Sequence, residues 1–163
     1  KKARELSDKP VWIKGMGWAA ENYELGAREM TAMKSLREAA KKAYGLAGIT
    51  KPLESLDVAE ICDTFSYREL MSYEALGFCE SGKSAALIEE GVTEMNGRLP
   101  VNPSGGALSG NPFKANGLVR LTEAALQVRG DAGDHQVDGA RTALAHGSYG
   151  FSGQGNSVII VGA

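Results

Sequence analysis

The sequence predicts an α/β fold in which a mixed, mostly parallel β-sheet is covered by helices. Strand-like and helical segments alternate along the chain, and right-handed crossovers between them produce parallel strand pairs. The chain has 163 residues, which is enough for one domain with its own hydrophobic core. Hydrophobic residues make up 43% and charged residues 23%, as in ordinary globular proteins.

The part of the chain before residue 63 predicts a strand, a helix and a second strand. Residues 11–17 form a short apolar run stopped by glycines, which indicates a strand. Residues 56–62 alternate between apolar and polar types like a second strand. Between them, apolar residues at three- and four-residue steps form one helical stripe before Gly48, and these are Met33, Leu36, Ala40, Ala43 and Ala47.

The middle of the chain predicts two helices and a brief strand. Residues 65–76 have a helical period that ends at Gly77, and residues 84–90 predict a short helix that ends at Gly91. Residues 99–102 read as a brief strand that leads into a loop rich in glycine.

The last part of the chain predicts a helix and a closing antiparallel hairpin. The helix covers residues 116–129 and has Leu118, Leu121, Ala125 and Val128 on one face. Residues 142–145 and 157–161 are apolar strands on either side of a glycine-rich loop at 146–155.

Charge and cysteine content exclude several classes of function. With 18 Lys and Arg against 20 Asp and Glu, the chain lacks the basic field of a nucleic-acid-binding protein. Two cysteines, Cys62 and Cys79, are too few for a disulfide scaffold or a zinc-ligand set, so we expect no metal and a reducing, cytoplasmic compartment. No apolar run approaches the roughly 18–20 residues of a membrane span, so we expect none.

Residues 77–84 match the phosphate-loop pattern G-x-x-x-x-G-K-[ST]. That pattern needs a preceding buried strand, whereas residues 68–76 have helical periodicity. Glu80 would also bring a negative charge against a polyphosphate. We therefore interpret the match as a coincidence, which unchanged nucleotide binding after Lys83→Ala would support.

Two glycine-rich loops are better candidates, because the 21 glycines of the chain become more frequent towards the C-terminus and ligands bind at strand ends in α/β sheets. In the first loop, Asn111 offers a side-chain amide to a developing oxyanion, with an ordinary tight turn as the alternative. In the second, His146 follows an apolar strand and is a candidate general base, with a structural histidine as the alternative. Cys62 ends a strand and is either a nucleophile or an inert buried thiol.

Taken in order, these segments resemble the C-terminal half of thiolases, especially the bacterial and archaeal branch related to sterol-carrier-protein thiolases. Glu-Ile-Cys-Asp-Thr-Phe at 60–65 stands where that family has Asn-Glu-Ala-Phe or His-Asp-Cys-Phe. Asn-Pro-Ser-Gly-Gly at 102–106 matches the family's strand-loop motif. Gly-Asn-Pro at 110–112, with Ala115 and Gly117, matches its Gly-His-Pro-x-Gly-Ala-Thr-Gly run. The loop from His146 stands where thiolases have Cys-x-Gly or His-Asn-x-Gly-Gly.

The resemblance runs from about residue 11 to the end and implies a thiolase-type fold of two similar α/β halves, usually paired into dimers or higher oligomers. Residues 1–163 would be one C-terminal domain, with the half that carries the nucleophilic cysteine absent from this chain. The implied substrate is a coenzyme A thioester, with no covalently bound cofactor. The resemblance also brings the thioester close to the backbone at Ser104, Gly105, Gly106 and Gly110.

The resemblance implies a role for each position of this sequence that matches a site residue of the family. Asn111 takes the place of the oxyanion-hole histidine, Cys62 that of the water-holding Asn or His, and His146 that of the acid/base cysteine. The implied function is an acyltransferase of the acetyl-CoA C-acyltransferase type, performing Claisen condensation or thiolysis of a β-ketoacyl-CoA.

Two alternatives follow from departures from the family pattern. Tyr149 beside His146 suits retro-aldol cleavage of a β-hydroxyacyl-CoA, as in thiolase-like lipid-transfer proteins that work with an OB-fold partner. Loss of the Gly-His-Pro histidine also permits a non-catalytic assembly subunit. A nucleophilic cysteine in the missing half would favour the acyltransferase, and its absence would favour either alternative.

Overall fold

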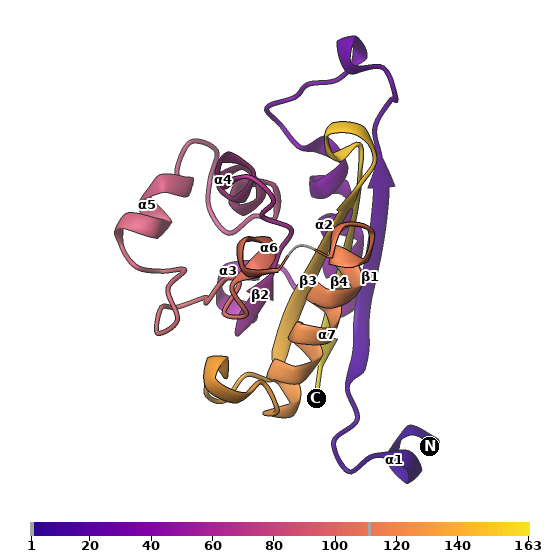
Figure 1. The fold of residues 1–163 in the computed structure, drawn as a ribbon, viewed down its shortest axis with the longest axis vertical. Coiled ribbons are helices and arrows are strands. Elements are labelled where there is room, and N and C mark those ends of the chain that lie inside the picture. The colour runs from indigo at the N-terminus through magenta and orange to yellow at the C-terminus, as the bar shows by residue number, and fades with distance from the viewer. Residues whose placement is uncertain (1, 111) are drawn as a thin grey trace.

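The computed structural model describes residues 2–110 and 112–163, and its centre is a sheet of four strands in the order β1-β4-β3-β2 (Figure 1). The strands are β1 (Trp12–Ala20), β2 (Val58–Glu60), β3 (Thr142–Tyr149) and β4 (Gly155–Gly162). β4 lies between β1 and β3 and is antiparallel to both, whereas β2 pairs with β3 in parallel.

Two long helices cover opposite faces of this sheet. α2 (Lys34–Ala47) packs on β1 and β4, and α7 (Asn116–Arg129) packs mainly on β3. Because successive residues of a strand face opposite sides, β3 contributes Leu144 to the core under α2 and its neighbours Ala143 and Ala145 to the core under α7. The sheet therefore separates two hydrophobic clusters, the larger of them on the α2 side.

Shorter helices complete the chain. α4 and α5 lie on the β2 side of the sheet, and α1 lies apart at the N-terminus (Figure 1). The short helices are α1 (Lys2–Leu6), α3 (Pro52–Ser55), α4 (Ser66–Ala75), α5 (Ser84–Glu89) and α6 (Gly106–Ser109), with 3-10 turns at η1 (Leu25–Ala27), η2 (Phe113–Ala115), η3 (Gly133–His135) and η4 (Phe151–Gly153).

The close contact between α2 and β1 depends on two glycines. A Cβ at Gly15 would overlap the carbonyl oxygen of Ala43, and one at Gly17 would overlap that of Ala39. Since Gly15 and Gly17 face α2, the helix backbone rests directly on the strand. α2 then ends at Gly48, whose φ of 72° is the left-handed conformation that glycine adopts without strain.

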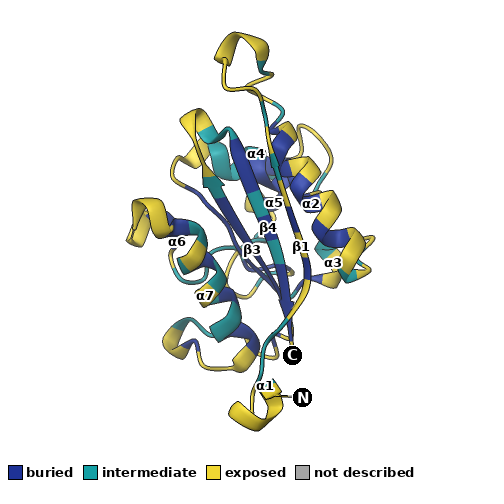
Figure 2. Ribbon diagram, turned by 90° about the vertical axis from the view of Figure 1, so that its right-hand side faces the viewer, coloured by how far each residue is buried: buried dark blue, intermediate teal, exposed yellow. Residues whose placement is uncertain are grey.

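The other face of β1 carries an apolar strip made of Ile13, Met16 and Trp18. These side chains are 64%, 54% and 65% exposed, and α7 does not cover them. Met16 pairs with Ile159, which packs with the α7 cluster, so the strip lies on the α7 face of the sheet. Figure 2 shows the contrast between the buried central strands and the exposed residues along β1.

The fold class and the two long helices are confirmed, as is the closing antiparallel hairpin. The prediction of a mostly parallel sheet is wrong, because β4 inserts between β1 and β3 and makes two of the three strand pairs antiparallel. The brief strand predicted at 99–102 is a single parallel bridge between Val101 and Ala59.

The prediction of a glycine-rich loop at 146–155 is also wrong over half of its length. β3 continues to Tyr149 and β4 begins at Gly155, so only residues 150–154 form the turn. His146 pairs with Val158 inside the ladder, and Ser148 pairs with Asn156. The strand was not predicted beyond residue 145 because His146, Gly147 and Ser148 are two polar residues and a glycine, and a strand is recognised in a sequence mainly by its apolar side chains.

Within the described residues, no helix is both long enough and apolar enough to cross a membrane.

Gly17→Ala should lower the free energy of unfolding by several kcal/mol, because the new methyl group meets helix backbone that cannot move aside. Gly45→Ala is the matched control, since it lies in α2 and its Cβ would meet nothing within 4 Å. That control should be neutral or stabilising by about 0.5–1 kcal/mol. Urea unfolding of both variants measures the difference, and equal midpoints would contradict the packing described here.

Candidate functional site

A cleft of about 750 Å³ lies where the carboxyl end of β2 meets the β3–β4 turn. Its walls come from five separate segments: the chain before α2, the residues after β2, α4, the start of α7 and the hairpin turn. The lining residues are Glu21, Arg28, Glu29, Met30, Met33, Cys62, Thr64, Phe65, Tyr67, Arg68, Met71, Phe113, Lys114, Asn116, Ser148, Tyr149, Gly150, Ser152 and Gly153.

The cleft combines apolar and cationic groups. Three methionines and the stacked rings of Phe65 and Tyr67, whose centroids lie 5.6 Å apart, give it an apolar wall. Arg28, Arg68 and Lys114 supply positive charge, which Glu21 and Glu29 in the same lining offset in part, since Glu21 lies 3.9 Å from Arg28. This composition suits a ligand that has both an apolar portion and negative charge.

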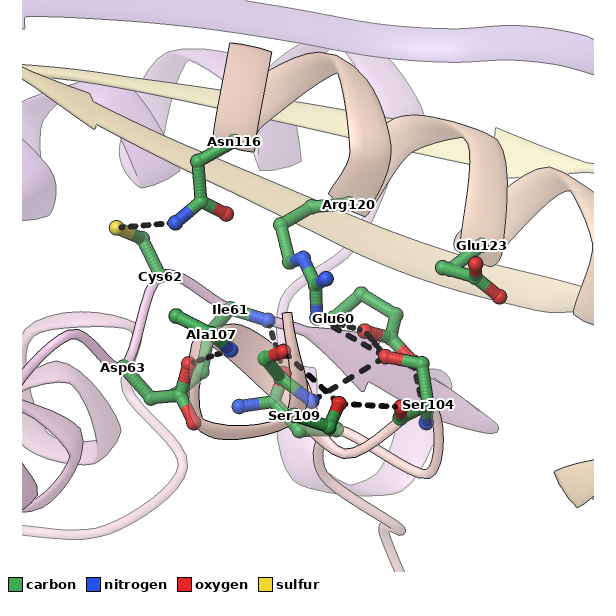
Figure 3. A network of polar contacts seen from close by, with 12 residues as sticks. Glu60, Ile61, Cys62, Asp63, Ser104, Ala107, Ser109, Asn116, Arg120 and Glu123 are labelled. Atoms are coloured by element: carbon green, nitrogen blue, oxygen red, sulfur yellow. Dashed lines mark hydrogen bonds and ion pairs between the residues drawn. The ribbon is translucent and has the colours of Figure 1, made fainter. Parts of the chain in front are cut away.

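Cys62 lies in this cleft and is only 5% exposed. Its Sγ accepts a hydrogen bond from Asn116 Nδ2 at 3.6 Å (Figure 3). The same sulfur lies 3.4 Å from the hydroxyl of Thr64. Asn116 is buried, with 4% of its surface exposed, and among the described residues its Oδ1 has no hydrogen-bond partner. Neither Asn116 nor Thr64 was predicted from the sequence. For Asn116 there is a usable signal, because it is a polar residue at the first position of a helix whose start faces the end of a strand.

His146 lies behind Cys62 and not in the cleft lining. The ring is fully buried, with Nδ1 3.3 Å from the backbone nitrogen of Cys62 and Nε2 2.9 Å from Oδ1 of Asn156. Burial lowers the pKa of His146 to about 4, with the Asn156 bond opposing this and the Arg68 charge adding to it. The imidazole is therefore neutral near pH 7, and its acid/base role remains a prediction.

Tyr149 ends β3 and lines the cleft, with about half of its surface exposed. Its ring lies over Gly155, where any Cβ would overlap ring carbons. Two arginines hold the adjoining turn: Arg28 donates to the carbonyl oxygens of Phe151 and Ser152, and Arg68 lies against Gly153. Of the predicted site residues that the structure describes, Cys62 and Tyr149 line the cleft, and Tyr149 is the more exposed of the two.

The predicted thioester contacts at 104–106 lie instead next to residues of the β2 end, with Ser104 beside Glu60 (Figure 3). Ser104 donates from its backbone nitrogen and its hydroxyl to the buried carboxylate of Glu60. Gly106 approaches Asp63 so closely that a Cβ would overlap the carboxylate, and Ala107 N–H donates to Asp63 Oδ1 at 2.6 Å. None of Ser104, Gly105 and Gly106 lines the cleft, so direct contact with a thioester remains a prediction.

A buried ion pair joins this loop to α7. Arg120 Nη1 lies 2.9 Å from Glu60 Oε2 and donates to Ser104 Oγ at 2.9 Å. Burial raises the pKa of Glu60, whereas the Ser104 hydrogen bonds and the Arg120 charge oppose that shift. The pair fixes the end of β2 from which Cys62 continues.

Two further predicted positions have different outcomes. Asn111 lies outside the described residues, so its oxyanion-hole role remains a prediction. Gly110 is exposed at the end of α6 and does not line the cleft.

The phosphate-loop match at 77–84 follows helix α4 and not a strand. Three of its donors are already occupied: Gly82 N–H and the hydroxyls of Ser81 and Ser84 bind the carboxylate of Glu74. These bonds leave no phosphate cradle, which agrees with reading the motif as a coincidence. In the described part of the chain, no three His, Cys, Asp or Glu side chains gather as a metal site.

Residues 17–163 match the family described as "Thiolase C-terminal domain-like". Acetyl-CoA acetyltransferase of Methanothermobacter thermautotrophicus is 36% identical over 153 residues, which cover 93% of this chain and 39% of that protein. Human sterol carrier protein 2 is 43% identical over 119 residues, covering 72% of this chain and 21% of that protein.

Among solved structures, the Ltp2-ChsH2(DUF35) aldolase superimposes with a TM-score of 0.81 at 27% identity, over 95% of this chain and 40% of the matched chain. A monomeric SCP2-thiolase-like protein from Mycobacterium smegmatis has a TM-score of 0.69 at 18% identity and supports the fold alone. The chain thus spans about two fifths or less of these relatives.

Arg120→Met should lower the free energy of unfolding by about 3–5 kcal/mol, because it leaves the carboxylate of Glu60 buried without its cation. Replacing both Glu60 and Arg120 by Met should recover much of that loss, since no unpaired charge remains. Chemical unfolding of the single and double variants tests the coupling. A single variant within 1 kcal/mol of the parent would show that the pair does not hold β2.

Proposed function

Because the chain belongs to the thiolase C-terminal domain-like family, we propose that it supplies one half of an active site that makes or breaks a carbon–carbon bond in a coenzyme A thioester. The activity that we propose first is a thiolase-like acyltransferase of the acetyl-CoA C-acyltransferase type. The observation that carries the proposal is the cleft itself, with Cys62, Thr64 and Asn116 gathered in it at the carboxyl end of β2.

The groups in the cleft suit thioester chemistry. Removing a proton from the carbon next to a thioester carbonyl requires donors that stabilise the negative charge on the carbonyl oxygen. The Asn116 amide and the Thr64 hydroxyl are neutral donors beside Cys62, and the predicted role of Asn111 would add a third. Arg68 and Lys114 provide positive charge for the phosphates of coenzyme A.

The remaining half of the site would come from a second, nucleophile-bearing thiolase half. The β1 apolar strip of Ile13, Met16 and Trp18 supports this, because an exposed apolar surface of this kind usually meets a partner. Leu118 on α7 is 66% exposed and extends the apolar surface on the same face of the sheet. In the acyltransferase, a cysteine of that half would carry the acyl group, and pairing of whole subunits would give a dimer.

A second candidate is a retro-aldolase acting on a β-hydroxyacyl-CoA, with an OB-fold partner. Tyr149 in the cleft supports it, because the oxygen of its phenolate form can take the proton of the β-hydroxyl group. The bond between the α- and β-carbons then breaks, a carbonyl compound leaves, and the electron pair stays on the thioester as an enolate to be protonated. The likeness to the Ltp2-ChsH2(DUF35) aldolase adds support.

Tyr149→Phe separates the two activities. In the complete protein, cleavage of a β-hydroxyacyl-CoA should fall about 100-fold or more if Tyr149 moves the proton, whereas thiolysis of a short β-ketoacyl-CoA should change little. Tyr23→Phe is the control, because Tyr23 is 73% exposed and outside the cleft lining.

Both activities are measured on parent and variants with free coenzyme A present, alongside mass spectrometry for a covalent acyl-enzyme. Thiolysis with an acyl-enzyme supports the acyltransferase, and aldol cleavage without one supports the aldolase. If the complete protein had neither activity, both the acyltransferase and the aldolase would be contradicted, and the non-catalytic assembly subunit would be the remaining alternative.

A further inference from the structure

A buried chain of hydrogen bonds links Glu21 to Cys62. Ser35 donates from its backbone nitrogen and its hydroxyl to Glu21 Oε1, at 3.0 and 2.9 Å. Asn156 Nδ2 donates to Ser35 Oγ at 2.8 Å, and Asn156 Oδ1 lies 2.9 Å from His146 Nε2. The backbone N–H of Cys62 donates to His146 Nδ1 at 3.3 Å. The two residues at the ends of this series of hydrogen bonds, Glu21 and Cys62, line the cleft. The three residues between them, Ser35, Asn156 and His146, are at most 2% exposed.

The direction of every bond in this chain follows from its ends. A backbone N–H can only donate, so Nδ1 of His146 must be the acceptor and the single ring proton must be on Nε2. Nε2–H then donates to Oδ1 of Asn156, which leaves the Asn156 amide group to donate to Ser35 and to the carbonyl oxygen of Gly153. The orientation of the amide and the tautomer of the imidazole therefore fix each other.

A second proton on His146 would break this arrangement. It would place an Nδ1–H against the Cys62 N–H, two donors facing each other in a site without solvent access. The charged groups nearest the ends of the chain offer no compensation, because Arg68 is also positive and Glu21 is separated from the ring by Asn156 and Ser35.

We propose that His146 is a positioning residue, which with Asn156 holds the main chain at Cys62 in the cleft through one fixed neutral tautomer. Proton transfer in the cleft then falls to Tyr149, Cys62 or groups of the second half. The link from positioning to catalysis rests on the proposed function, whereas the tautomer and the chain of bonds do not.

The first test is nitrogen NMR of the protein labelled with ¹⁵N-histidine. His146 should give the signature of a neutral ring protonated at Nε2, unchanged between pH 5 and 8. His135 is the internal control, since its side chain is 37% exposed beside Glu123, and His135→Gln assigns the two signals. A His146 ring that becomes charged in this range, or that is protonated at Nδ1, would overturn the proposal whatever the protein catalyses.

The second test is rescue by a conservative substitution. Gln at position 146 can still donate to Asn156, whereas Leu cannot, so His146→Gln should keep turnover within about tenfold of the parent and His146→Leu should lose about 100-fold or more. The pH profile of His146→Gln should keep the limbs of the parent profile. Equal losses in both variants, with the same limb of the profile gone, would assign His146 to proton transfer and refute the positioning role.

Discussion

The carboxyl end of β2 is held by one buried interaction on which the site depends, the ion pair between Glu60 and Arg120. Glu60 is the last residue of β2, and Arg120 reaches it from α7, which covers one face of the sheet. Ser104 binds both partners, so the same contact also fixes the glycine-rich loop. A buried charge without its partner is costly, and helix, strand and loop are therefore constrained to one arrangement.

From that fixed point the chain enters the cleft. Ile61 N–H donates to the side chain of Asn102, and Asp63 accepts from Ala107 N–H, so the residues on both sides of Cys62 are held by the same loop. The backbone N–H of Cys62 itself donates to Nδ1 of His146. The backbone that carries the Cys62 thiol is thus held on both sides, while of the two groups beside the thiol Thr64 lies two residues further along the same segment and Asn116 comes from α7. Pre-organised donors of this kind suit an oxyanion site, because they need no rearrangement during reaction.

Sequence reasoning found the elements that follow simple periodicity and missed those shaped by neighbours. The apolar stripe before Gly48 and the helix at 116–129 were predictable because local side-chain spacing decides them. The continuation of β3 to Tyr149 was not, because His146, Gly147 and Ser148 are held there by pairing with β4 and not by their own propensity. Likewise, the resemblance brought Cys62 and Tyr149 to one cleft, but the burial of His146 and the part of Asn116 depend on packing between segments far apart in sequence.

The central claim is that the cleft around Cys62 receives the thioester, and alkylation of the two cysteines tests it most directly. Cys79 is the matched control, because it lies outside the cleft lining and burial together with the Glu74 charge raises the pKa of its thiol. Saturating acetoacetyl-CoA should slow the reaction of Cys62 with iodoacetamide, read by peptide mass spectrometry, and leave that of Cys79 unchanged. Equal alkylation of Cys62 with and without the thioester would contradict the claim.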